Sequence, residues 1–124
     1  MIQIMEKGLE RMQDFMNKNS GWSDKTFDDG KFNRGRALPI SYHLQKESKE
    51  LTESLDKYFK EKTAKNFAKA KEELADCTIL VLDCATHFGC NADELITACY
   101  NKLEKNKSRV WGKPDKNGVV EHVK

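Results

Sequence analysis

Residues 64–88, AKNFAKAKEELADCTILVLDCATHF, decide the predicted fold. Apolar side chains recur in this stretch at steps of three and four residues, which is the spacing of one face of an α-helix. We therefore expect a helix from Ala64 to Phe88, followed by Gly89 at the position where glycine favours helix termination. The apolar stripe of this helix consists of Phe67, Ala70, Leu74, Cys77, Val81, Cys84 and Phe88.

Two carboxylates border this stripe. Glu73 lies between Ala70 and Cys77, and Asp76 falls on the flank of the stripe. A step of three residues places both carboxylates on one face of a helix, one turn apart. Acidic side chains are rarely buried unless they are paired or bound to a metal ion. The alternative is an ordinary solvated helix face, because 34% of the chain is charged.

A matching pair, Glu47-x-x-Glu50, lies upstream in a second amphipathic stretch, with 22 residues between Glu50 and Glu73. Glu47 falls on the apolar stripe of this stretch and Glu50 on its flank. Glu50-x-x-Glu53 fits the same spacing, but Glu53 points further from the stripe, so we prefer the first pair. The stripe consists of Leu44, Leu51, Leu55 and Tyr58.

Four carboxylates that converge on one place repel one another strongly unless a cation lies among them. Oxygen-only ligands suit a hard divalent ion. The pattern therefore predicts a site for Mg²⁺ or Mn²⁺ held by Glu47, Glu50, Glu73 and Asp76. A di-iron carboxylate protein is disfavoured, because that class uses Glu-x-x-His and the chain contains no such motif.

Three further helices are predicted from periodicity and helix-end signals. They cover Ile2–Asn19, with Gly21 as a stop, Pro39–Lys62, and a stretch capped by Asn91 that ends near Asn106. Short connections between the last three helices favour antiparallel neighbours. We therefore expect an all-α, antiparallel four-helix bundle-like fold, with residues 1–124 forming a single domain.

The N-terminal helix carries apolar residues at the spacing of a coiled-coil seam. This seam can pack on the domain's own core or on a second subunit, and its three methionines favour an irregular partner surface. A second possible function follows, that of a non-catalytic helical interaction module using this amphipathic helix. The seam consists of Ile2, Met5, Leu9, Met12 and Met16.

A long loop is predicted from Ser20 to Leu38, because three glycines interrupt a stretch without periodicity. Its aromatic and basic residues suit a nucleotide lid, or the aromatic residues simply fix the loop to the core. They are Trp22, Phe27 and Phe32, among Lys25, Lys31, Arg34 and Arg36.

Charge is unevenly distributed along the chain. The net charge of +2 is too small for a general polyanion binder, and the acidic central helices argue against a partner that is a nucleic acid. Residues 101–124 nevertheless contain six Lys and one Arg against three acidic residues. This basic region suits a metal–phosphate site, or alternatively a solubilising tail.

The cellular compartment is predicted from three features that the sequence does not contain. The four cysteines form no CxxC pair, the N-terminus lacks the apolar run of a signal peptide, and no stretch approaches the ~20 apolar residues of a membrane span. We expect a cytoplasmic protein with reduced thiols and no membrane partner.

Together these motifs resemble the MazG-like all-α nucleoside triphosphate pyrophosphohydrolases, and most closely their phage and bacterial dATP/dGTP pyrophosphohydrolase branch. The resemblance covers the chain from about Trp22 to the C-terminus. Besides the carboxylate pairs it depends on WSDKTF (22–27), HLQKESKEL (43–51), EELAD (72–76), KLEKNKSRVW (102–111) and GVVEHV (118–123).

The resemblance implies Mg²⁺-dependent hydrolysis of a nucleoside triphosphate between its α and β phosphates, which releases the monophosphate and pyrophosphate. The substrate it implies is a purine deoxynucleotide, with dATP and dGTP both open. It also implies a homodimer or homotetramer with sites near subunit interfaces, in the host cytoplasm if a phage encodes the chain. The expected metal ligands are Glu47, Glu50, Glu73 and Asp76, and the expected phosphate-binding residues are Lys102 and Arg109.

Glu47 and Glu50 are the expected catalytic residues, with Glu50 as the general base because it flanks the stripe. His43, one turn before Glu47, either contacts a base, orients a metal ligand or is structural. Trp111 either packs across a subunit boundary or stacks on a purine. Without the resemblance, the preferred interpretation of Lys102 and Arg109 is that they are ordinary cations near a helix C-terminus, where they interact favourably with the helix dipole. The basic, glycine-containing loop departs from the family pattern, so base selectivity stays open.

Overall fold

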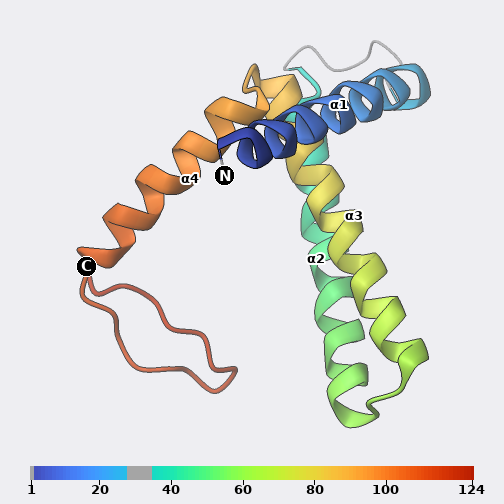
Figure 1. Ribbon diagram of the computed structural model, residues 1–124. Helices are drawn as coiled ribbons and strands as arrows, with labels where there is room; N and C mark the ends of the chain where they lie inside the picture. The colour runs from blue at the N-terminus through green and yellow to red at the C-terminus, as the bar shows by residue number, and fades with distance from the viewer. Residues whose placement is uncertain (1, 28–34) are drawn as a thin grey trace. The chain divides into compact units, whose positions relative to one another are not determined.

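The computed structural model describes residues 2–27 and 35–124, with side chains from residue 6 onward in the first range. It contains four α-helices: α1 (Ile2–Phe27), α2 (Ala37–Lys60), α3 (Ala64–Phe88) and α4 (Ala92–Lys107). The all-α prediction is confirmed (Figure 1). The chain divides into two compact units, Met1–Ala92 and Asp93–Lys124.

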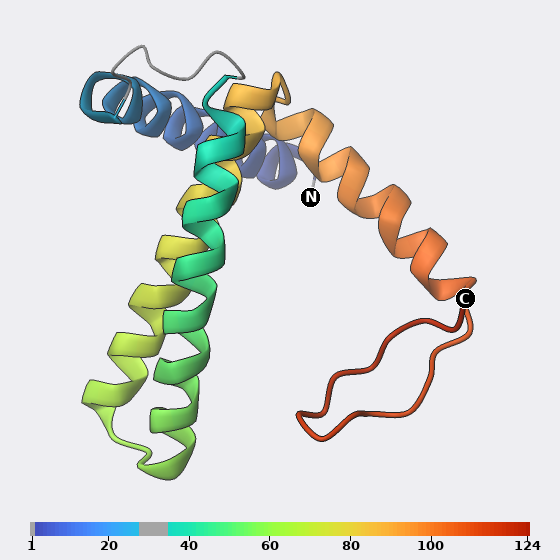
Figure 2. The same ribbon diagram turned by 180° about the vertical axis from the view of Figure 1, so that it is seen from behind.

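In the first unit, α2 and α3 form an antiparallel hairpin, and α1 packs on α3. Figures 1 and 2 show α1 crossing the end of the hairpin that is remote from the α2–α3 connection. The predicted bounds of α3 are confirmed. Thr63 begins the helix by accepting a hydrogen bond from the Asn66 backbone N–H, and Gly89 ends it with a positive φ of 91°. Pro39 lies in the first turn of α2, as expected.

The prediction that α1 ends at Asn19 is wrong. The helix continues through Gly21 to Phe27, so the expected loop from Ser20 is helical over its first eight residues. Glycine weakens a helix by only about 1 kcal/mol relative to alanine, and burial of Met16 and Ser23, both 1% exposed, outweighs this cost. The expected loop positions at 28–34, like the side chains of Ile2 and Met5, lie outside the described residues.

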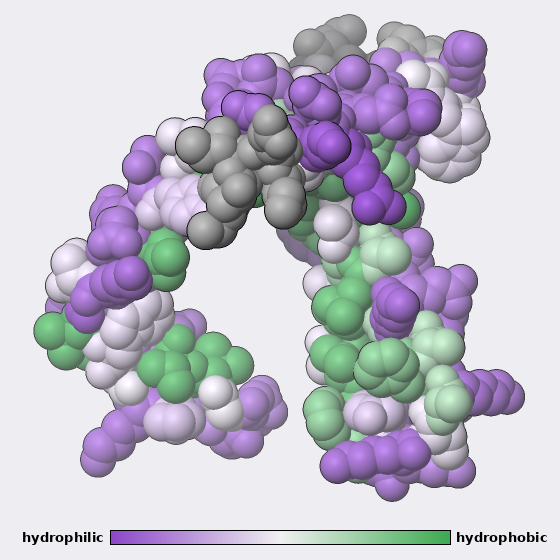
Figure 3. Space-filling view, in the orientation of Figure 1, coloured by the Kyte–Doolittle hydropathy of each residue, from purple (hydrophilic) through white to green (hydrophobic). Residues whose placement is uncertain are grey.

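The apolar stripe predicted for α3 is only partly correct. Ala70 is buried and Cys77 and Cys84 are half-buried, as expected. Four other members of the stripe are exposed, because the inner face of α3 is instead formed by Asn66, Ala70, Glu73, Leu82, Asp83 and Ala85. The exposed members are Phe67, Leu74, Val81 and Phe88. Figure 3 shows apolar side chains on the surface of the hairpin.

The second unit contains most of α4 and the C-terminal segment. Trp111 and His122 form an isolated antiparallel bridge, a pairing that the sequence did not predict. A turn closes this segment, because the Asp115 carboxylate accepts hydrogen bonds from the backbone N–H groups of Asn117 and Val119, at 2.8 and 2.9 Å. Across the described residues, no helix combines the length and apolar character needed to cross a membrane.

Candidate active site

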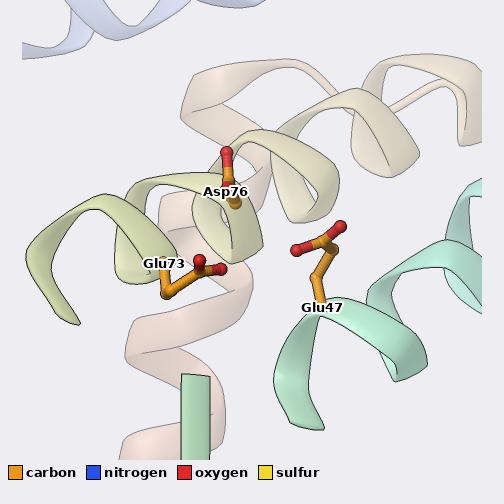
Figure 4. Close-up of side chains that lie close together, drawn as sticks. All are labelled: Glu47, Glu73 and Asp76. Atoms are coloured by element: carbon orange, nitrogen blue, oxygen red, sulfur yellow. The ribbon is translucent and has the colours of Figure 1, made fainter. Parts of the chain in front are cut away.

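The α2–α3 hairpin brings together three of the four predicted metal ligands. Glu47 of α2 and Glu73 and Asp76 of α3 each place one carboxylate oxygen within 4.8 Å of the others. Figure 4 shows the Glu47 side chain reaching from α2 toward the two side chains of α3. We call these three residues the acidic cluster. The cluster forms because Glu73 and Asp76, three residues apart on α3, lie on one face of that helix and face Glu47 on the antiparallel helix α2.

The acidic cluster is largely removed from solvent. Glu73 is 4% exposed and the Glu47 side chain 19% exposed. One buried oxygen of each, Oε2, has no hydrogen-bond donor among the described residues. A buried acceptor without a partner costs about 1–3 kcal/mol. A bound divalent cation would satisfy both oxygens, so the donor set fits a hard ion such as Mg²⁺.

The repulsion between these carboxylates contributes to the pKa of Asp76. Burial and the negative charges of Glu73 and Glu47 raise the pKa of Asp76 above its usual value. Burial and the same charges raise the pKa of the neighbouring Cys77 thiol. A cation within the cluster would reverse the effect on Asp76, since an opposite charge favours the ionised carboxylate.

Glu50, the fourth predicted ligand, lies at the rim of the acidic cluster. Its side chain is exposed, and its oxygens lie outside the group of three that converge. Hydrogen bonding with Glu47 and repulsion from its charge raise the pKa of Glu50. Glu50 therefore interacts with the acidic cluster through Glu47 while its carboxylate remains accessible to solvent. Its role as a ligand or base stays a prediction.

Two basic side chains contact the acidic cluster. His43 Nε2 lies 3.2 Å from Glu47 Oε1, which favours the expectation that His43 orients a metal ligand. Lys69 Nζ lies 3.0 Å from Glu73 Oε1. Hydrogen bonding with Glu73 raises the pKa of Lys69. Lys69 was not predicted from the sequence, although its i,i+4 spacing from Glu73 was a usable signal.

A cavity of about 430 Å³ adjoins the acidic cluster within the first unit. Glu47 and Asp76 line one end of it, and Asp83 of α3 lines it two turns further along the helix. Its volume falls in the usual range for a small-molecule site, about 300–1,000 Å³. The apolar part of the wall includes Ile40, Ile79 and Leu80.

Two aromatic residues of α1, Trp22 and Phe27, also line this cavity. Their rings meet edge to face, with centroids 5.3 Å apart, and both side chains remain more than half exposed. From the sequence, both residues were expected in a loop that suits a nucleotide lid or is fixed to the core. The structure places them on the last turns of α1.

A polar network, missed by the sequence analysis, joins α1 to α3 beside the cavity. Ser23 Oγ donates a hydrogen bond to Asp83 Oδ2 at 2.6 Å. His87 Nδ1 lies 2.8 Å from the Asp83 carbonyl oxygen, and His87 Nε2 lies 2.6 Å from Asp24 Oδ1. Arg36 donates to the same Asp24 oxygen at 2.7 Å. The only sequence signal was the i,i+4 spacing of Asp83 and His87.

The remaining predicted residues lie in the second unit. Lys102 is exposed, and Arg109 Nη1 donates to the Asn106 side-chain oxygen at 3.3 Å. Trp111 Nε1 donates to the Asn106 carbonyl oxygen at 2.9 Å, and the Trp111 ring meets His122 edge to face. The Trp111 side chain is thus fixed to the end of α4. The roles predicted for Lys102, Arg109 and Trp111 in nucleotide binding stay predictions.

Comparison with known proteins agrees with this chemistry. A family model described as dATP/dGTP pyrophosphohydrolase matches residues 15–124, which include most of the first unit and all of the second. Comparisons with curated proteins and with solved structures found no match. The family match confirms the resemblance drawn from the sequence motifs, and with it the prediction of an enzyme of the nucleoside triphosphate pyrophosphohydrolase class.

Proposed function

Because the chain belongs to the dATP/dGTP pyrophosphohydrolase family, we propose that it hydrolyses a purine deoxynucleoside triphosphate to the nucleoside monophosphate and pyrophosphate, with a divalent metal ion. The observation that carries this proposal is the position of the acidic cluster at one end of the largely apolar cavity. The two parts of the site match the two parts of a nucleotide, which are a charged phosphate chain and a flat base.

The acidic cluster is the proposed metal site. Glu47, Glu73 and Asp76 would hold Mg²⁺, or Mn²⁺, through carboxylate oxygens. When bound, such an ion neutralises phosphate charge and lowers the pKa of bound water. A triphosphate is itself strongly anionic, so these carboxylates would repel it if no cation lay between them.

Glu50 is the proposed general base. It interacts with Glu47 and is exposed to solvent, so it can take a proton from water and pass it to bulk solvent. Its raised pKa moves its basicity toward neutrality, which suits proton transfer from water. His43 orients Glu47, because its Nε2 lies 3.2 Å from Glu47 Oε1 and can limit the rotation of that carboxylate.

The base and the phosphates would contact different residues. The aromatic rings of Trp22 and Phe27 offer stacking surface at the cavity, and stacking on an aromatic side chain is worth about 1–3 kcal/mol per base. Lys102 and Arg109 are the proposed phosphate-binding residues. Arg109 offers a planar fork of donors and Lys102 a point charge.

We also propose that the enzyme is a homodimer or homotetramer. Phe67, Leu74, Val81 and Phe88 recur every seven residues along α3 and are between 43% and 82% exposed. We call these four residues the α3 ridge. A heptad repeat of exposed apolar side chains is typical of a helix that packs on another helix. A second copy of the chain supplies a matching ridge.

A product analysis tests the proposed reaction. The protein is incubated with each of the four dNTPs and four NTPs in Mg²⁺, in Mn²⁺ and in EDTA, and the products are separated by anion-exchange chromatography. We expect equal amounts of monophosphate and pyrophosphate from dGTP or dATP with a metal ion, and none with EDTA. Release of a diphosphate and orthophosphate, or turnover that EDTA leaves unchanged, would contradict the proposal.

A further inference from the structure

Asp83, a buried carboxylate, lines the cavity without a role in the reaction described above. It is 4% exposed. Its Oδ2 accepts the Ser23 hydroxyl at 2.6 Å, while its buried Oδ1 makes no hydrogen bond among the described residues. His87 Nδ1 lies 3.1 Å from Oδ1 but directs its hydrogen bond to the Asp83 carbonyl oxygen, at 2.8 Å. Asp83 is thus fixed in place with acceptor capacity left over.

A buried donor lines the same cavity. The side-chain nitrogen of Asn19, on α1, is buried and has no acceptor among the described residues. Leaving a buried donor or acceptor unpaired costs about 1–3 kcal/mol. Asn19 therefore offers an unused donor to whatever occupies the cavity, and Asp83 Oδ1, which faces His87 Nδ1 at 3.1 Å, keeps a further lone pair as an acceptor.

The spacing along α3 indicates which part of a nucleotide would reach Asp83. Asp76 belongs to the acidic cluster, and Asp83 follows it by seven residues, a rise of about 10 Å along the helix. Ile79 and Leu80 line the cavity between them with apolar side chains. If the phosphates lie at the acidic cluster, the polar edge of the base lies at Asp83.

We propose that Asp83 is a specificity-determining residue that accepts hydrogen bonds from the Watson–Crick edge of guanine, so that the enzyme prefers dGTP to dATP. This inference rests on the proposed function. Asn19 complements Asp83 by donating to a guanine carbonyl oxygen.

The chemistry of the four bases supports guanine. Only guanine presents two adjacent donors on this edge, N1–H and the 2-amino group. Adenine and cytosine each place an amino donor beside a bare ring nitrogen, and thymine places its single N–H between two carbonyl oxygens. A carboxylate has only acceptors, so it repels these neighbouring lone pairs. Sites that hydrogen-bond a substrate group reject analogues without that group by far more than apolar pockets do.

Substrate analogues test the proposal on the unaltered protein. We measure kcat/KM for dGTP, dATP, dITP and N1-methyl-dGTP with Mg²⁺. We expect dGTP to exceed dATP by about 100-fold. We expect dITP, which lacks the 2-amino group, to lose about tenfold, and N1-methyl-dGTP, which lacks the N1–H, to lose at least as much. Equal values for dGTP and dATP, or for dGTP and its N1-methyl derivative, would overturn the assignment of Asp83.

An isosteric variant provides the second test. Asp83→Asn replaces an acceptor with a donor, so we expect kcat/KM for dGTP to fall about 100-fold while that for dATP changes less than threefold. Glu72→Gln, an exposed change on the same helix, is the control. Equal losses for both substrates would assign Asp83 a purely structural role. Turnover of other dNTPs without a guanine preference overturns this inference alone, whereas no turnover of any substrate overturns the proposed function as well.

Discussion

Glu73 is the most buried carboxylate of the acidic cluster. It is 4% exposed, has Asp76 and Glu47 as neighbours, and forms an ion pair with Lys69, its one ion pair among the described residues. A buried carboxylate normally needs full pairing or a metal ion. Burial and the charges of Glu73 and Glu47 raise the pKa of Asp76. Hydrogen bonding with Glu47 and repulsion from its charge raise the pKa of Glu50, so both carboxyl groups hold their protons more tightly when no cation is present.

Mg²⁺ should therefore stabilise the protein more at pH 7.5 than at pH 5. The raised pKa values of Asp76 and Glu50 mean that the folded state holds these protons more tightly than the unfolded state. Without metal, stability falls as pH rises through these pKa values. Mg²⁺ at 100 times its Kd would restore about 2.7 kcal/mol, or on the order of 10 °C in Tm.

Thermal unfolding with and without Mg²⁺ at both pH values measures this effect. Glu47→Gln, which removes one ligand, should lose most of the Mg²⁺-induced shift, whereas Glu53→Gln, an exposed change on the same helix, should keep it. An equal shift at pH 5 and pH 7.5 would contradict the account of the acidic cluster.

The helical spacing of the acidic residues made them predictable from the sequence. The hydrogen-bond network around Asp83 could not be predicted in this way. Glu47, Glu73 and Asp76 lie at helical spacing next to apolar stripes, so local periodicity was sufficient to select them. Asp83 depends on Ser23, which lies 60 residues away, and no local pattern records such a contact. Burial of Glu73 likewise depends on how α2 packs, which periodicity alone leaves open.

At the scale of elements, the end of α1 shows that a glycine in the sequence does not always mark the end of a helix. Gly21 resembles a C-terminal stop, yet it has no positive φ and the helix continues for six residues beyond it. The continuation places Ser23 and Asp24 against Asp83 and His87 of α3. Tertiary hydrogen bonds thus override the local propensity of glycine, and they also bring Trp22 and Phe27 to the cavity.

The contact between α1 and α3 should weaken as pH rises. Burial lowers the pKa of His87, but hydrogen bonds to Asp24 and Asp83 and their charges outweigh it, so the pKa is raised. The stabilisation is complete below the unfolded-state pKa of about 6.5 and is lost as pH rises through the higher folded-state value.

Urea unfolding of the wild type and of His87→Gln between pH 6 and pH 9 tests this prediction. The variant should be less stable at pH 6, and the difference between the two proteins should shrink toward pH 9. His122→Gln, which changes a histidine of the C-terminal segment, is the control. A difference that is constant or grows with pH would show that the imidazolium does not hold the two helices together.

At the scale of the whole molecule, the exposed apolar surface is the basis of the proposed self-association. The chain has a mass of 14.3 kDa, and its first unit buries few large side chains completely. The α3 ridge leaves four large apolar residues in solvent, which is costly unless another surface covers them. The sequence predicted these four residues as members of the apolar stripe of one helix. It could not separate intramolecular from intermolecular burial, because both require the same periodicity.

Light scattering after size exclusion should give two or four times the mass of one chain. Val81→Glu places a charge on the α3 ridge and should shift the protein toward the monomer. Val110→Glu changes a more exposed valine, 71% against 43%, in the second unit and should leave the mass unchanged. A monomeric wild type, or a Val81→Glu variant with unaltered mass, would contradict the proposed interface.

The most direct test of the proposed active site compares pyrophosphate release by the wild type, Glu47→Gln, Asp76→Asn and Glu53→Gln, with Mg²⁺ and the better of dGTP and dATP. Removing one metal ligand should cost several kcal/mol of transition-state stabilisation, so we expect both cluster variants to lose at least about 1,000-fold in kcat. Their helical circular dichroism should remain unchanged, and Glu53→Gln should retain wild-type activity. Near-normal turnover by either cluster variant would contradict the assignment of the reaction to Glu47, Glu73 and Asp76.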